Sequence, residues 1–364
     1  MGRFESAELV AREAAEMFTQ AGASPLWAHE TLGEAFFLRG EMDAARRIFT
    51  SMLQSGADRM STAFARLQLA HVAIATGDVE EGLEALRALA KDALDAGADR
   101  AHYDAHVSLV ESLVDLHEAG WLSADELDRA ITELDDAEAL SRAAFGTDPP
   151  WYTIFFPLRR SELVALRAPA EALALSQTAL ERAQASCPEM VPEAARVHGQ
   201  HLIRAGRYEE ALTTLALAET AAQQEERLNE SASARRWGIV AAVLAGMPIA
   251  DVEARVTALR ETLESSDSPR LKAEQLLDLA RALPAASTVP DARVLADEAL
   301  DLFAAMPYPA KQARSMEVAG DVLATRGDAE GARRRYRAAL ALLERFQLRL
   351  CIPCIEAKAG PEGP

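Results

Sequence analysis

The segment TLGEAFFLRGEMDAARRIFTSML, residues 31–53, decides the fold class of this chain. It places Gly33 in one helical pattern and Ala45 and Phe49 in the next, with Gly40 between them. Gly40 is typical of a turn, because glycine adopts the left-handed conformation that other residues disfavour. Small residues let two helices approach closely, and a large residue fills the groove between them. The segment therefore predicts an antiparallel helical hairpin.

The same pattern recurs in VHGQHLIRAGRYEEALTTLALAE (197–219) and VAGDVLATRGDAEGARRRYRAAL (318–340). The aligned positions are Gly199, Gly206, Ala211 and Leu215 in the second copy, and Gly320, Gly327, Ala332 and Tyr336 in the third. A fair copy turns at Gly77, and degraded copies turn near Gly120, Arg167, Gly246 and Leu283–Pro284. One hairpin cannot bury its own apolar face, so successive hairpins are expected to stack.

These repeats resemble the tetratricopeptide repeat (TPR) family. Alanine, leucine, glutamate and arginine dominate the composition, and no stretch alternates with period two as a strand would. We therefore expect an all-α protein, and the resemblance implies a right-handed α-α superhelix of about eight helical hairpins after an N-terminal helix. The family's helix tryptophan is mostly missing, and the repeats are longer than the family's, which makes them similar to the arrays of bacterial signalling regulators.

The segment GTDPPWYTIFFPLRR, residues 146–160, lies at the widest gap between turns. Pro149 and Pro150 interrupt any helix and favour extended backbone. We expect a bend there, with an N-terminal helix and repeats 1–3 in residues 1–146 and repeats 4–8 in residues 147–350. The Pro/Gly-rich residues 351–364 are expected to form a flexible tail.

Bulk properties exclude several function classes. The formal net charge of −19 opposes direct binding of nucleic acid, because lysines and arginines must displace counterions from phosphates. No apolar stretch is long enough to span a bilayer, and three cysteines are too few for a disulfide-built secreted protein. We therefore expect a cytoplasmic protein with no membrane partner, and the oligomeric state stays open.

The sequence carries none of the common catalytic motifs. The chain has no glycine-rich phosphate loop, no nucleophile elbow and no H-E-x-x-H pattern, so we expect neither an enzyme nor a cofactor. His102 and His106 share one helical face, and Cys351 and Cys354 have the spacing of a redox or half-zinc motif. Packed or solvated side chains explain both pairs better, and a metal or redox protein is kept as a third hypothesis.

The family resemblance implies that extended peptides or partner helices bind in a concave groove lined by the first helix of each hairpin. Two groups of polar and aromatic residues are expected to face this groove: Trp27, Glu30, Glu34 and Phe37 in the first unit, and Arg196, Gln200 and Arg204 in the fifth. A third group lies at the proline bend: Trp151, Tyr152, Phe155, Phe156 and Arg159. The helical spacing of Trp151, Phe155 and Leu158 favours core packing, and groove contact through Trp151, Tyr152 or Phe156 is the second interpretation.

The leading hypothesis is a non-catalytic scaffold that binds a protein or peptide partner. The alternative is a ligand- or peptide-sensing regulatory domain of a bacterial signalling or transcription regulator, in which a ligand changes the superhelical pitch. The family's carboxylate clamp, which uses lysines and asparagines, does not map here, because Glu30 and Glu34 stand in the corresponding region.

Overall fold

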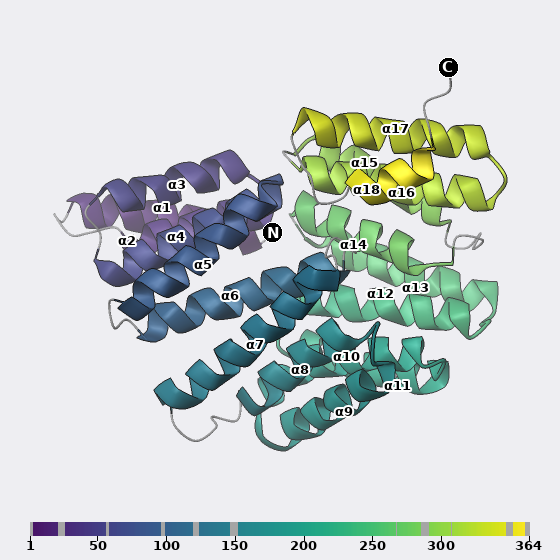
Figure 1. The fold of residues 1–364 in the computed structure, drawn as a ribbon, viewed down its shortest axis with the longest axis horizontal. Coiled ribbons are helices and arrows are strands. Elements are labelled where there is room, and N and C mark those ends of the chain that lie inside the picture. The colour runs from purple at the N-terminus through teal and green to yellow at the C-terminus, as the bar shows by residue number, and fades with distance from the viewer. Residues whose placement is uncertain are drawn as a thin grey trace. The chain divides into compact units, whose positions relative to one another are not determined.

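The computed structural model describes residues 3–20, 26–55, 58–95, 99–118, 124–145, 152–266, 268–284, 291–306, 308–346 and 352–360. Within these parts nearly all regular structure is α-helical (Figure 1). None of the helices so described is both long and apolar enough to cross a membrane.

The helices of the described residues run in the following order: α1 (Arg3–Gln20), α2 (Leu26–Arg39), α3 (Met42–Gln54), α4 (Arg59–Thr76), α5 (Val79–Asp95), α6 (Asp99–Glu118), α7 (Ala124–Phe145), α8 (Tyr152–Val164), α9 (Pro169–Ser186), α10 (Val191–Arg204), α11 (Tyr208–Gln224), α12 (Leu228–Leu244), α13 (Ile249–Glu264), α14 (Pro269–Ala282), α15 (Ala292–Ala304), α16 (Pro309–Thr325), α17 (Ala329–Arg345) and α18 (Ile352–Ala359). A short 3₁₀ turn, η1 (Pro188–Met190), precedes α10.

Helices α2 to α17 follow one another as hairpins, beginning with α2–α3 and ending with α16–α17. Most chain neighbours pack together, such as α4 with α5 and α16 with α17. The first helices of adjacent hairpins also make contact: α2 with α4, α8 with α10, α10 with α12, and α14 with α16. We call these the first helices below. The predicted fold class, an all-α TPR-like helical repeat, is confirmed.

The packing that the repeat pattern predicts is present inside the hairpins. A Cβ atom added to Gly33 would come within 2.5 Å of the Phe49 ring, and one added to Gly320 would come within 2.5 Å of the Tyr336 ring. The helices therefore approach so closely that no other residue fits these positions without a shift. Gly40 ends α2 with a φ of 87°, a left-handed conformation that suits glycine.

Contacts divide the chain into two compact units. Unit 1 comprises Met1–Ser108, Glu264–Ala286 and Asp291–Pro364, and unit 2 comprises Leu109–Leu263 and Ser287–Pro290. Unit 1 thus joins the two ends of the chain, which the sequence patterns did not predict. The bend expected between residues 146 and 147 lies outside the described residues and stays a prediction.

Part of the segment expected to be a flexible tail forms helix α18 instead. Ile355 is 1% exposed, so α18 buries an apolar side chain. Lys358 Nζ lies 2.7 Å from Glu317 Oε1 and 2.8 Å from Asp321 Oδ2, which ties α18 to α16. The composition of the segment hides this helix, because its anchors are single residues matched to partners about forty positions away.

Candidate functional site

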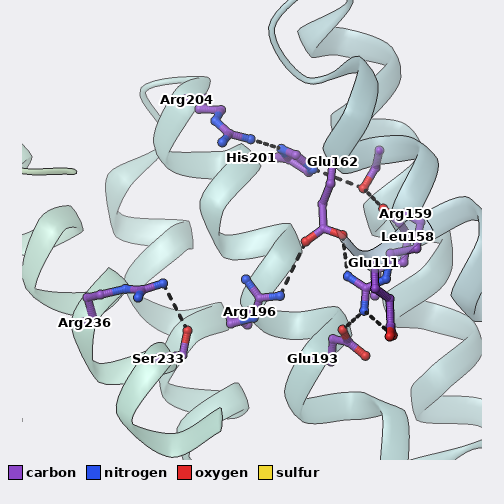
Figure 2. A network of polar contacts seen from close by, with 11 residues as sticks. Glu111, Leu158, Arg159, Glu162, Glu193, Arg196, His201, Arg204, Ser233 and Arg236 are labelled. Atoms are coloured by element: carbon purple, nitrogen blue, oxygen red, sulfur yellow. Dashed lines mark hydrogen bonds and ion pairs between the residues drawn. The ribbon is translucent and has the colours of Figure 1, made fainter. Parts of the chain in front are cut away.

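A network of charged and polar side chains links the first helices of unit 2. It draws on α6, α8 and α10, and we call it the polar network (Figure 2). Its members are Glu111, Arg159, Ser161, Glu162, Glu193, Arg196, Gln200, His201 and Arg204. Six of the candidate binding residues predicted in this region have described side chains, and four of them, Arg159, Arg196, Gln200 and Arg204, lie within the polar network, with Arg204 at its edge.

Arg159 on α8 is the centre of the polar network. Its Nη1 donates to Glu162 Oε2 at 2.6 Å, and its Nη2 pairs with Glu193 on α10. The Glu111 carboxylate of α6 lies 4.0 Å from the same Nη2. The Arg159 side chain is 9% exposed and that of Glu162 is 1% exposed. A buried guanidinium is thus surrounded by three carboxylates, which compensates the loss of its hydration.

Arg196 carries the polar network along α10. Its Nη2 donates to Glu162 Oε1 at 3.4 Å, so Glu162 bridges two arginines. With the Gln200 amide turned so that its oxygen faces donors, this oxygen accepts from Arg196 Nη1 at 2.7 Å and from Trp237 Nε1 at 2.5 Å. Gln200 is fully buried. The amide therefore connects the ion pairs to α12, the next first helix.

Two ion pairs join α8 to α10, one with its arginine on α8 and the other with its arginine on α10, and both have the same sequence separation. Arg159 pairs with Glu193 and Glu162 pairs with Arg196, and each pair is 34 residues apart. A third contact at the same separation, Gln68 Nε2 to Glu34 Oε1 at 3.4 Å, joins α4 to α2 in unit 1. Glu162 and Glu193 were missed in the sequence analysis. The signal that the sequence holds for each is an arginine 34 residues away, which by itself does not distinguish them from other acidic residues.

His201 ends the polar network in its neutral form. Burial, followed by the neighbouring Arg204, lowers the pKa of His201 to about 3. Arg204 Nη1 donates to His201 Nδ1 at 3.2 Å, so the proton resides on Nε2, which donates to Ser161 Oγ at 3.1 Å. Ser161 in turn donates to the Leu158 carbonyl at 2.6 Å. The chain of donors thus runs in one direction, from Arg204 to α8.

The charges of the polar network stabilise one another. Burial lowers the pKa of Arg159, but Glu193, Glu162 and Glu111 outweigh this effect and raise it. Burial raises the pKa of Glu193, and Arg159 with Arg196 reverses the shift and lowers it. The pKa of Glu111 is raised, because burial and the other two carboxylates outweigh Arg159. Arg159 and Glu193 therefore favour their charged forms, whereas Glu111 takes up a proton more readily than Glu193 does.

Of the four aromatic residues predicted at the proline bend, the structure describes the side chains of Phe155 and Phe156. Phe155 is 1% and Phe156 is 2% exposed, and their rings meet edge to face with centroids 5.3 Å apart. Arg159 Cζ lies 5.2 Å from the centroid of the Phe155 ring. Phe155 thus has the core packing that its helical spacing favours. Phe156, a candidate for the groove, is buried as well, and we propose no partner contact through these two rings. The side chains of Trp151 and Tyr152 lie outside the described residues.

The candidate residues of the first hairpin lie on α2 in unit 1. Burial, followed by the charge of Glu30, raises the pKa of Glu34. Phe37 contacts the chain itself, since Arg270 Cζ of α14 lies 4.5 Å from the centroid of its ring. The side chain of Trp27 lies outside the described residues. Phe37 is thus covered by a helix that the sequence patterns place six hairpins away.

The candidate metal ligands are arranged as packing residues. The His102 and His106 rings meet edge to face with centroids 4.7 Å apart, and His102 Nδ1 donates to the Ala90 carbonyl at 2.6 Å. Among the described residues no third His, Cys, Asp or Glu joins them to form a metal-binding group. The side chains of Cys351 and Cys354 lie outside those residues.

The polar network is a fixed array of charges with one exposed cation. Arg204 is solvent-exposed and is oriented by the neutral His201, and no described carboxylate pairs with it. A guanidinium has five N–H donors, so Arg204 keeps donors available for a carboxylate or a carbonyl group of a ligand. Such an array is suited to binding and orienting a polar chain.

No protein-family model matches the chain, and no curated protein matches it. Among solved structures, the chain is similar to RapI in its apo form, with 12% identity over 88% of this chain and 98% of that one and a TM-score of 0.49. It is similar to a Rap protein complexed with Competence and Sporulation Factor, with 11% identity over 92% and 96% and a TM-score of 0.49. A signal-transduction ATPase with a tetratricopeptide repeat sensor from Pyrococcus horikoshii has 12% identity over 96% and 55%, also with a TM-score of 0.49. Identities of this size do not transfer a function.

Proposed function

We propose that this protein is a non-catalytic TPR-like scaffold that binds a protein or peptide segment along the first helices of unit 2. The supporting observation is the polar network, in which Glu162 and Arg159 are buried together and Arg204 is left exposed at the edge. A buried ion pair adds little to stability compared with apolar residues of the same volume. A buried polar network of this size is therefore a candidate for orienting a ligand.

In this proposal Arg204 contacts the partner directly and the buried members hold α8, α10 and α12 in register. Gln200 and Trp237 provide the link to α12. The part of the ligand that meets Arg204 needs acceptor groups, such as carboxylates or backbone carbonyls, because this exposed cation is a donor. The network also exposes the Glu111 carboxylate, whose side chain is 48% exposed.

The test starts from peptides selected by phage display against the full chain. Arg204→Glu is then compared with Arg207→Glu, a matched charge reversal at an exposed arginine that pairs only locally with Glu210. We expect Arg204→Glu to weaken peptide binding at least about tenfold, equivalent to about 1.4 kcal/mol, with the helical content unchanged. Equal affinities for the two variants would reject the polar network as the binding site.

A second candidate function is a ligand-sensing regulatory array. It is favoured by one observation, the contact between Phe37 of the first hairpin and Arg270 of the seventh, which a ligand could stabilise or break. Small-angle scattering with and without the selected peptides separates the two candidates. A scaffold keeps its radius of gyration on binding, whereas a sensor changes it.

A further inference from the structure

The C-terminal end of α2 and the N-terminal end of α14 meet inside unit 1. Ser268 Oγ donates to the Leu38 carbonyl at 2.8 Å, across 230 residues of sequence. Arg270 Nη1 donates to the Phe37 carbonyl at 3.1 Å. Carbonyls in the last turn of a helix lack partners in the helix itself, and cations are favourable there. The start of α14 therefore acts as a cap for the end of α2.

Side chains extend this contact. Arg270 Cζ lies 4.5 Å from the centroid of the Phe37 ring and 5.7 Å from that of Tyr308. At Gly40 the backbone is so close to the loop before α16 that an added Cβ would meet Met306 Sδ at 2.9 Å. Ser268 is 3% exposed, so its hydrogen bond is shielded from water.

His71 on α4 lies beside the same contact. Its ring centroid is 6.4 Å from that of Phe37. Burial, followed by the charge of Arg270, lowers the pKa of His71 to about 4. The His71 imidazole is therefore neutral at ordinary pH. The Arg270 guanidinium contacts the Phe37 ring and the Phe37 carbonyl, and the histidine beside them is uncharged.

We propose that Ser268, Pro269 and Arg270 form a releasable clasp, an intramolecular ligand that occupies a docking surface on the first hairpin. The described contacts of Ser268 and Arg270 with α2 include two hydrogen bonds and a cation–π contact, which a competing helix can replace one for one. The surface exposed on release consists of the Phe37 ring and the Phe37 and Leu38 carbonyls. It fits the start of a helix that carries a hydroxyl residue and, two residues later, an arginine. This inference does not depend on the ligand of unit 2.

Variants of the full chain separate the clasp from the helix cap of α14. Ser268 Oγ also accepts from Leu271 N at 3.1 Å. Ser268→Asp keeps an acceptor for that cap but has no donor for Leu38, whereas Ser268→Thr keeps both. We expect hydrogen exchange in residues 34–41 and 268–275 to become at least about tenfold faster in Ser268→Asp and in Arg270→Ala. Ser268→Thr and the exposed control Arg334→Ala should exchange as the parent does. Unchanged exchange in both clasp variants would overturn the proposal.

A labelled synthetic peptide of residues 266–282 tests the docking surface. We expect it to bind the Arg270→Ala chain at least about tenfold more tightly than the parent chain, in which the clasp competes. Adding Phe37→Ala to that variant should abolish the gain, and a peptide that itself carries Arg270→Ala should bind neither. Equal binding to the parent and to the Arg270→Ala chain, or no binding to either, would refute the docking surface.

Discussion

Leu215 of α11 lies against Gly199 of α10 so closely that a Cβ added at residue 199 would come within 2.7 Å of the leucine Cδ2 and Cγ atoms. Gly199→Ala should therefore destabilise the protein by about 1–3 kcal/mol, because the neighbouring helix must move. Denaturant unfolding of the two proteins measures the difference.

Gly238 in α12 is the matched control for this substitution. The nearest atom to its added Cβ, Arg255 Nη1, is 3.8 Å away, and the residue is inside a helix. Gly238→Ala should leave the protein unchanged or up to about 1 kcal/mol more stable, since alanine has the higher helix propensity. A neutral Gly199→Ala would contradict the close packing of α10 and α11.

Glu162 is the most deeply buried carboxylate of the polar network. Glu162→Gln keeps the shape of the side chain but removes the charge that Arg159 and Arg196 share. Breaking a buried ion pair from one side leaves an uncompensated charge, so we expect a loss of about 3–5 kcal/mol in the free energy of unfolding. The exposed pair of Glu330 with Arg334 provides the control, and Glu330→Gln should cost less than about 0.5 kcal/mol. Similar costs for the two substitutions would contradict the assigned burial.

The lowered pKa of His201 predicts how the free energy of unfolding depends on pH. Its ordinary pKa is 6.5 and burial lowers it to about 3 in the folded protein, so the unfolded chain binds the proton more tightly. The stability linked to His201 is then complete above pH 6.5 and is lost as the pH falls from 6.5 toward 3. Between pH 7.5 and pH 5 the loss should be about 2 kcal/mol, and His201→Gln should abolish it. Urea unfolding of the parent and the variant at each pH measures this loss. An equal change in the free energy of unfolding between pH 7.5 and pH 5 in the two proteins would contradict a neutral, buried His201.

The ion pairs of Lys358 with Glu317 and Asp321 are expected to hold α18 against α16. Lys358→Ala leaves the Glu317 carboxylate, whose side chain is 3% exposed, with Arg314 as its remaining arginine partner. Because Lys358 itself is 37% exposed, we expect a modest loss of about 1 kcal/mol and faster hydrogen exchange in residues 352–359. Arg334→Ala, an exposed cation on α17, should change neither quantity. Unaltered exchange in α18 after Lys358→Ala would show that apolar contacts alone hold it.

The sequence predicted what short-range patterns encode. Gly33 and Phe49 are sixteen positions apart within one hairpin, so the pattern that joins them is visible in one repeat and recognisable in the next. The hairpins, their turns and their close contacts follow from such patterns. Arg196 and Gln200 were grouped for the same reason, because a four-residue step places them on one helical face, and their role in binding stays a prediction.

Partners that lie in other repeats were not predicted. With 57 acidic residues in the chain, nothing local distinguishes Glu162 or Glu193 from a carboxylate on a solvated surface. The contact of Ser268 with Leu38 spans 230 residues, and neither residue belongs to a repeated pattern. Such pairings depend on how far successive hairpins rotate, a property of three-dimensional packing that a one-dimensional pattern does not contain.

Unit 1 is built from segments at both ends of the chain, and this determines the order in which the two units can fold during synthesis. Unit 2 is made almost entirely from one continuous stretch, Leu109–Leu263, and can fold as soon as that stretch has left the ribosome. Residues 1–108 emerge earlier but meet α14 only after the whole of unit 2 has been translated. The nascent chain therefore holds its first hairpins without their contacts to α14 during that interval.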